Sequence, residues 1–259
     1  MHYPILATQA RRDRSWAALP ASLLGLLLLW QAIVSLGGYR AFILPGPSLV
    51  GQRLVESIAS GVLWRHTSVT LVEALGGFAL ALVVGSLLGY LLAHLPWLER
   101  ALAPILAASQ AVPIVAVAPL VILWSGPGLR SKIFIAALIT FLPILLNTII
   151  ALRGIPRELR EMALISGADR WQMLTYVEMP LALPVLFGGV RAGLALATTG
   201  AVVGEFVAGR DGLGALINIA RGLFDTPLIF VALVTLAAIT LVLYLLATTL
   251  ERALVRWEP

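Results

Sequence analysis

Residues able to carry covalent or metal chemistry are scarce in this sequence of 259 residues. Cysteine is absent, so the chain has no thiolate nucleophile and no disulfide framework. The histidines, His2, His66 and His94, are far apart and outside any H-E-x-x-H pattern, so a metal site has little support. Lys132 is the single lysine and follows Ser131, whereas the lysine of a P-loop follows a glycine. We therefore expect no catalytic residue, no metal site and no ATPase motif in this chain.

The longest polar stretch of the sequence is residues 153–184, which are predicted to form two short helices separated by Gly167. Pro156 suits the first turn of the first helix, and Asp169 suits the N-cap of a second helix that ends before Pro180. Because about two to eight residues are enough to connect packed helices, this length indicates a docking surface for another subunit. The alternative is an amphipathic loop that rests on lipid headgroups.

The elements that must hold this loop are long apolar stretches. Hydrophobic residues make up 60% of the sequence and charged residues 12%, and the mean hydropathy is +0.97. Six stretches of about 20 residues can each span a hydrocarbon core of ~30 Å, and they lack the alternation of a membrane β-barrel. We therefore predict an all-α membrane protein with a single transmembrane domain over residues 1–259. The predicted spans are about 15–38, 70–94, 101–124, 131–152, 185–207 and 227–250.

The basic residues set the predicted orientation. With a cytoplasmic N-terminus, ten basic residues fall in cytoplasmic segments and seven on the opposite side. The positive-inside rule favours this arrangement, which places both termini in the cytoplasm. A signal peptide, suggested by Arg11 and Arg12, is the alternative for the first span, but its apolar run exceeds the usual ~7–15 residues. This topology also accounts for the net charge of +5, so no nucleic-acid partner is expected.

The segment between the first two spans carries apolar residues at every fourth position. Val50, Leu54, Ile58 and Val62 follow a chain break at Leu44-Pro-Gly-Pro47. This spacing predicts a short amphipathic helix that lies on the membrane surface. The alternative is a packed loop helix that makes no contact with lipid.

The fifth span differs from the other predicted spans, whose apolar runs are uncharged, because Arg191 and Glu205 fall inside it. They are fourteen residues apart, or ~21 Å along a helix, so they cannot pair with each other. We expect Arg191 to extend toward the cytoplasmic boundary, whereas Glu205 is a gate residue, an ion-pair partner of Arg210, or a carboxylate exposed at the headgroups. Small residues at steps of four in this span indicate close packing, either inside one subunit or across a dimer axis. Prolines interrupt the third and fourth spans, as is typical of transport pathways. The candidate pathway or gate residues are Gln110, Asn147, Arg191, Thr198, Thr199 and Glu205.

The loop of residues 153–184 resembles the EAA motif of bacterial ABC importer permeases, E-A-A-x₃-G-x₉-I-x-L-P. The glutamate, the second alanine, the glycine and the proline match at the same spacing, and apolar residues replace the other three positions. The resemblance implies that this segment is an ATPase-coupling loop. Its motif residues are Glu161, Ala163, Gly167, Val177, Met179 and Pro180.

Further sequence features are similar to the nitrate/sulfonate/taurine-type permeases, a group that also resembles permeases for pyrimidine precursors of thiamine and for riboflavin. These features are Leu44-Pro-Gly-Pro47, Gly189-Val-Arg191, and Gly204-Glu205 followed by Gly212-Leu-Gly214. The resemblance covers nearly the whole chain and implies a type I ABC importer permease fold, with about six transmembrane helices in the bacterial inner membrane.

The resemblance also implies partners and a substrate class. The permease would form a homodimer, or pair with a paralogue, and would bind two ATP-binding subunits and an extracytoplasmic substrate-binding protein. ATP and Mg²⁺ would be bound by the partner ATPase, with no cofactor in this chain. The solute would be a sulfonate-, nitrate- or taurine-like anion, or a vitamin or vitamin precursor such as riboflavin or hydroxymethylpyrimidine. No basic residue lies near the middle of a span to favour an inorganic anion.

The alternatives to an ABC importer permease are an ion-coupled secondary transporter and an intramembrane enzyme. An ion-coupled secondary transporter requires ionisable residues near the midplane and an inverted repeat between halves, and neither is clear in the sequence. An intramembrane enzyme would require a paired aspartate within the spans, an H-E-x-x-H pattern or a G-x-S-x-G pattern, and the sequence contains none of these.

Overall fold

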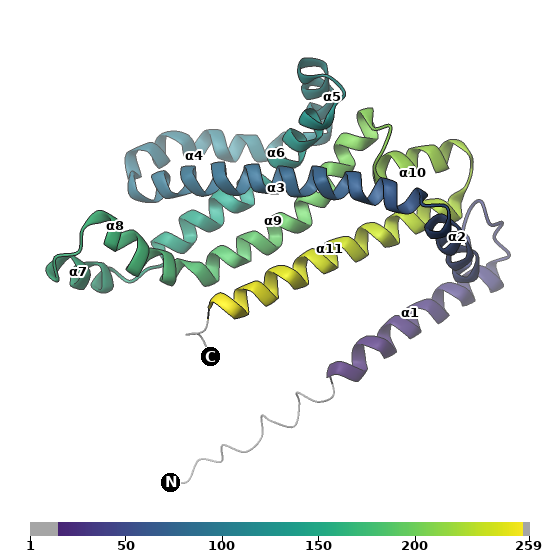
Figure 1. Cartoon of the computed structure of the whole chain (residues 1–259), viewed down its shortest axis with the longest axis horizontal. Coiled ribbons are helices and arrows are strands. Elements are labelled where there is room, and N and C mark those ends of the chain that lie inside the picture. The colour runs from purple at the N-terminus through teal and green to yellow at the C-terminus, as the bar shows by residue number, and fades with distance from the viewer. Residues whose placement is uncertain (1–14, 256–259) are drawn as a thin grey trace, which may run out of the picture.

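The computed structural model describes residues 15–255, and every regular element in this range is a helix. Three long helices form the centre: α3 (Val62–His94), α6 (Leu129–Arg153) and α9 (Met179–Ala208). They pack against one another along their lengths, and α11 (Thr226–Leu254) packs along α9 (Figure 1). The all-α fold predicted from the sequence is confirmed.

The central helices approach closely because glycines face the backbones of their neighbours. A Cβ atom on Gly200 of α9 would lie 2.6 Å from the Cα atom of Ala136 in α6. A Cβ atom on Gly89 of α3 would lie 2.7 Å from the Cβ atom of Thr148 in α6. A larger side chain at either glycine would force two helices apart. The small residues of α9 therefore serve packing inside one subunit.

Four helical segments are long and apolar enough to cross a membrane: α3, α6, α11 and the run Arg170–Ala208 that contains α9. The pair α4 (Pro96–Ala111) and α5 (Ile114–Ser125) adds a fifth span if it is counted as one. Helix α1 (Ser15–Gly37) adds 23 residues at the edge of the bundle. This arrangement agrees with about six spans.

The predicted span of residues 101–124 is not one straight helix, because α4 and α5 meet at 97°. Pro113 has no backbone N–H to continue the helical ladder. Val112, which precedes it, has φ −84° and ψ 115°, the extended conformation that a following proline favours. The break therefore follows from the residues at the junction.

Two other helices begin earlier than the predicted spans 70–94 and 185–207. Helix α3 begins at Val62 because the polar residues of its first turns have partners. Arg65, for example, forms an ion pair of 2.8 Å with Asp211. Helix α9 begins at Met179 because a preceding helical segment runs directly into it. Hydropathy marks where apolar residues begin, whereas paired polar residues allow a helix to continue beyond that point.

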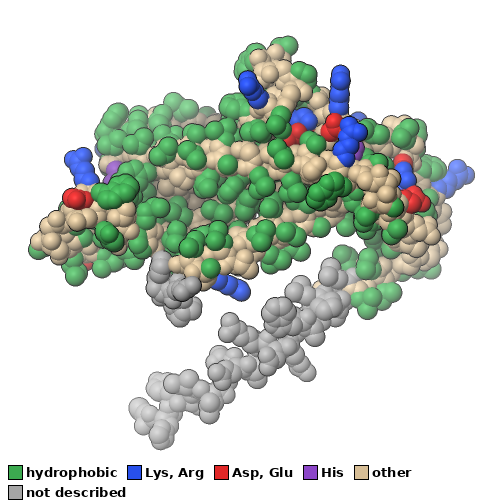
Figure 2. Space-filling view, in the orientation of Figure 1, with side chains coloured by type: hydrophobic (Ala, Val, Ile, Leu, Met, Phe, Trp, Pro, Cys, Tyr) green, Lys and Arg blue, Asp and Glu red, His purple; other side chains and the backbone are tan. Residues whose placement is uncertain are grey.

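The remaining short helices lie at the two ends of the bundle (Figure 1). One end carries α2 (Pro47–Ala59) and α10 (Leu213–Gly222). The other end carries α7 (Arg157–Ile165), α8 (Arg170–Gln172) and a π-helix, η1 (Met173–Glu178). Figure 2 shows hydrophobic side chains over the flank between these ends, with most of the visible charged side chains nearer the ends. This distribution is the one expected for a chain that crosses a bilayer.

Helix α2 is packed on one side and exposed on the other. Val50 is buried in a cluster with residues of α10 and α11, and Arg53 forms an ion pair of 2.6 Å with Asp225. Hydrogen bonds to Glu56 and Asp225 raise the pKa of Arg53. Ile58 is 60% exposed. The packed-helix alternative therefore describes the Val50 side of α2, while the Ile58 side remains available to the membrane surface.

Candidate functional site

The loop between α6 and α9 turns at a glycine. Gly167 has a φ of +83°, a backbone angle that glycine adopts without strain. The N–H of Ala168 donates to the carbonyl of Ala163 at 3.0 Å, which ends α7 in a Schellman-type turn. Asp169 is the N-cap of α8, as predicted: its carboxylate accepts the N–H of Gln172 at 2.8 Å, and the Gln172 side chain accepts the N–H of Asp169 at 2.9 Å. These hydrogen bonds hold α7 at a defined angle to the helices that follow.

The second helix of the loop differs from the prediction. Helix α8 has three residues and leads into the π-helix η1, which continues into α9 without a break. Pro180 therefore lies inside a continuous helical run, at the junction of η1 and α9, rather than after the end of a helix. The prediction that a second helix ends before Pro180 is wrong, and the predicted loop limit of residue 184 lies inside α9.

Three of the motif residues line one hollow. Ala163 of α7, Val177 of η1 and Pro180 of α9 contribute to an open hollow of about 470 Å³. Met162 also lines it and is 65% exposed. Glu161 forms an exposed ion pair of 2.7 Å with Arg157. The hollow presents an apolar surface at the end of the bundle, which is the kind of surface that receives a protein partner.

A buried carboxylate that sequence reasoning did not select holds this loop in place. Glu178 is 2% exposed, and its Oε1 atom lies 3.0 Å from Nε2 of His94 in α3 and 3.3 Å from a guanidinium nitrogen of Arg160 in α7. Arg160 also donates to the carbonyl of Leu152 in α6 at 2.6 Å. Glu178 therefore connects α7, α3 and the start of α9. The available signal was a single charged residue in the apolar run that precedes Pro180.

The opposite end of the bundle contains Glu205, which is fully buried. Its Oε1 atom accepts the hydroxyl of Thr70 at 2.6 Å, and its Oε2 atom accepts the N–H of Gly214 at 2.5 Å. Thr70 in turn accepts the N–H of Leu213 at 2.8 Å. Exposure of Glu205 at the headgroups is therefore wrong, and its donors are these groups rather than Arg210. Glu205 fastens the turn between α9 and α10 to α3.

A second carboxylate lies in the same region and was also missed. Glu73 is 1% exposed and forms an ion pair of 2.8 Å with Lys132 of α6. The Nδ1 atom of His66, which is also buried, lies 2.8 Å from the carbonyl oxygen and 3.1 Å from the backbone nitrogen of Gly212. The predicted spans began or ended close to Glu73 and Lys132, so these residues were treated as boundaries. Their mutual contact arises only when α3 and α6 pack.

The structure does not bring the other pathway candidates together. Arg191 forms an ion pair with Glu251 of α11, one residue beyond the end of the predicted span 227–250. Thr198 is buried and shares a hydrogen bond of 2.9 Å with Thr240. The remaining candidates differ in exposure: the amide of Asn147 donates to the carbonyl of Pro143, while Gln110 and Thr199 are exposed.

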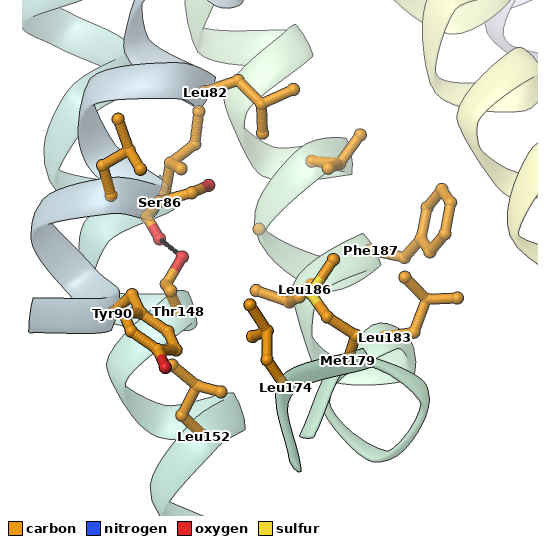
Figure 3. Close-up of a pocket in the computed structure, with 14 residues that line it drawn as sticks. Leu82, Ser86, Tyr90, Thr148, Leu152, Leu174, Met179, Leu183, Leu186 and Phe187 are labelled. Carbon is orange, nitrogen blue, oxygen red and sulfur yellow. Dashed lines mark hydrogen bonds between the residues drawn. The ribbon is translucent and has the colours of Figure 1, made fainter. Parts of the chain in front are cut away.

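A further cavity of about 480 Å³ lies between α3, α6 and the start of α9 (Figure 3). Its walls are mainly aliphatic and include Phe187 of α9. Polar atoms reach it from Ser86 and Tyr90 of α3 and from Thr148 of α6. Met179 lines this cavity, whereas its neighbours in the motif line the hollow described above. The start of α9 therefore lies between this partly open cavity and the exposed hollow.

These features define a helical membrane protein with an apolar hollow at one end of its bundle and a cavity between its central helices. Residues 81–257 match the family described as "Binding-protein-dependent transport system inner membrane component", and the chain belongs to this family. The protein is therefore the permease component of an ABC importer. Family membership implies ATPase and binding-protein partners. It also favours an ABC importer permease over a secondary transporter or an intramembrane enzyme.

Two relatives and one solved structure show what kinds of transporter this chain is similar to. The chain is 72% identical over 245 residues to "Riboflavin transport system permease protein RibX" of Chloroflexus aurantiacus, covering 94% of this chain and 91% of the relative. It is 32% identical over 247 residues to "Formylaminopyrimidine transport permease protein ThiX" of Halalkalibacterium halodurans, covering 95% and 98%. A chain of the MetNI methionine ABC transporter, in an inward facing conformation, matches with a TM-score of 0.63 at 23% identity, over 78% of this chain and 98% of that chain. This last match supports the fold.

Proposed function

We propose that this permease carries riboflavin into the cell. The observation that supports this substrate is the 72% identity to a riboflavin transport permease along 94% of this chain. Identity to the formylaminopyrimidine relative is 32%, and identity to a putative aliphatic sulfonate permease of Bacillus subtilis is 34%. The substrate named for the first relative is therefore the best supported choice among those expected from the sequence.

The proposed assembly contains two identical permease subunits, two ATP-binding subunits and an extracytoplasmic binding protein. The hollow lined by Ala163, Val177 and Pro180 receives the ATPase, because it is apolar and lies on a helix that projects from the bundle. ATP and Mg²⁺ bind to the ATPase rather than to this chain. The end that carries α10 then faces the binding protein, and both termini lie on the ATPase side.

Transport by the reconstituted complex tests this proposal. The permease is co-purified with its ATPase, placed in liposomes loaded with ATP, and supplied with its binding protein and labelled solutes. We expect saturable uptake of riboflavin that requires ATP and is unaffected by excess taurine or formylaminopyrimidine. Uptake of an aliphatic sulfonate or of the pyrimidine in place of riboflavin would overturn the proposed substrate. Liposomes without ATP are the control for passive entry.

A further inference from the structure

The cavity between α3, α6 and the start of α9 has the size and composition of a ligand pocket. Its volume of about 480 Å³ falls within the range of roughly 300–1,000 Å³ in which small-molecule sites occur. Aliphatic walls with a few polar groups are also typical of such sites. The two aromatic rings that line the cavity, Tyr90 of α3 and Phe187 of α9, come from different walls (Figure 3).

Two of the three hydroxyl groups in the cavity are free to bind a guest. The hydroxyl of Thr148 donates to the carbonyl of Ile144 at 2.8 Å, so its proton is already used. The hydroxyls of Ser86 and Tyr90 form no hydrogen bond within residues 15–255. A lipid acyl chain could fill the apolar space but would leave both hydroxyls without partners. A guest with polar atoms at the edge of an apolar body would satisfy them.

The cavity has no charge on any of the described residues that line it, so it is unsuited to the anions among the solutes expected from the sequence. A sulfonate or nitrate would therefore leave water without gaining an ionic partner, which is strongly unfavourable. An uncharged, flat heteroaromatic ring has apolar faces for the aliphatic walls and ring heteroatoms for the hydroxyls.

We propose that this cavity binds the isoalloxazine ring of a flavin inside a single permease subunit, an inference that rests on riboflavin as the substrate. The bound ring contacts Leu174 of η1 and Met179 of α9, which line the cavity. Val177 and Pro180 in the same segment line the hollow on the ATPase side. Occupancy of the cavity therefore acts directly on the segment that holds the coupling loop.

Flavin binding to the permease–ATPase complex in lipid nanodiscs, without the binding protein, tests the site. The probes are riboflavin and lumiflavin, which shares the ring but lacks the ribityl chain, and the signal is the quenching of flavin fluorescence. We expect saturable binding of both probes, with no displacement by taurine. Ser86→Phe fills the cavity and raises the Kd of both probes about tenfold or more. The matched control is Ser109→Phe, because Ser109 lines a separate apolar hollow, and its Kd stays at the wild-type value.

Ser86→Ala and Tyr90→Phe provide a test that does not depend on filling the cavity. Each removes one free hydroxyl and keeps the cavity open, and we expect the Kd of lumiflavin to rise about threefold or more. Equal Kd values for Ser86→Phe and Ser109→Phe would overturn the site, as would unchanged Kd values in both hydroxyl variants. Equal quenching by empty nanodiscs would show that flavin only enters the lipid, which also overturns it. Failure of the wild-type complex to transport riboflavin overturns the proposed substrate, whereas normal transport with binding unaffected by these variants overturns the cavity site alone.

Discussion

Replacing Thr70 with valine should loosen the turn between α9 and α10 without changing the shape of the side chain. The hydroxyl of Thr70 donates to the carboxylate of Glu205 at 2.6 Å and accepts the N–H of Leu213 at 2.8 Å. Valine removes both hydrogen bonds. It also leaves the N–H of Leu213, in a fully buried residue, without a partner.

The expected loss follows from the two bonds. A hydrogen bond to a charged group contributes ~1.5–3 kcal/mol, and a buried donor left without a partner costs ~1–3 kcal/mol. The lower ends of these ranges add to about 2.5 kcal/mol. Since ~1.4 kcal/mol is tenfold in an equilibrium constant, local opening of the turn should become roughly fifty- to hundredfold more frequent.

Hydrogen exchange at the amides of Leu213 and Gly214, measured by mass spectrometry on the purified complex, reads this opening directly. We expect exchange at these amides to accelerate about fiftyfold. The matched control is Thr67→Val, because the Thr67 hydroxyl is buried without a hydrogen-bond partner in the described chain, so its removal should be nearly neutral. An acceleration below about threefold in Thr70→Val, or an equal effect in the control, would refute the assignment of Thr70 and Glu205 as the clamp on this turn.

Three further outcomes are expected. Gly167→Val should abolish substrate-stimulated ATPase activity at unchanged membrane abundance, because φ of +83° strongly disfavours a β-branched residue; normal transport would contradict the docking role. Hydrogen bonds to Glu56 and Asp225 raise the pKa of Arg53 in the folded protein. The contribution of these bonds to folding stability is therefore fully present below the pKa of Arg53 in the unfolded chain. It is lost only as the pH rises through the higher pKa of the folded state. Asp225→Asn should therefore lower Tm equally at about pH 7 and pH 9, and a larger effect at one of these values would be inconsistent with that shift. A reporter active only outside the cytoplasm should be active when inserted after Asp211 and silent when fused to the C-terminus, and the reverse pattern would overturn the proposed orientation.

The turn in the loop between α6 and α9 was predictable because its signals are local. A glycine that turns the chain and a capping aspartate act over a few residues, so Gly167 and Asp169 could be placed from spacing alone. The continuation of the loop into α9 through a π-helix could not. Local rules predict that a helix ends before Pro180, whereas the helical run continues through it next to Glu178, which is paired with His94 of α3 and Arg160 of α7.

The candidate pathway was less predictable because polar residues in a span acquire their roles from other helices. Glu205 was recognised as important from its cost in an apolar setting, but its partner Thr70 lies 135 residues away in the sequence. Glu73 and Lys132 were read as span boundaries, although each neutralises the other inside the bundle. Thr198 shares a hydrogen bond with Thr240 of α11, 42 residues away in the sequence.

Local patterns in the sequence were enough to predict the membrane class, the helical fold, the approximate spans and the turn in the loop between α6 and α9. Each of these depends on hydropathy, on the 3.6-residue period or on short-range turn chemistry, all of which are properties of neighbouring residues. The buried charge pairs, the hydroxyl groups without partners and the positions of the cavities could be found only in the folded structure. Those properties depend on which atoms of distant segments come within about 3–4 Å of one another, and a polar group in a membrane protein is stabilised or left unpaired only through such contacts.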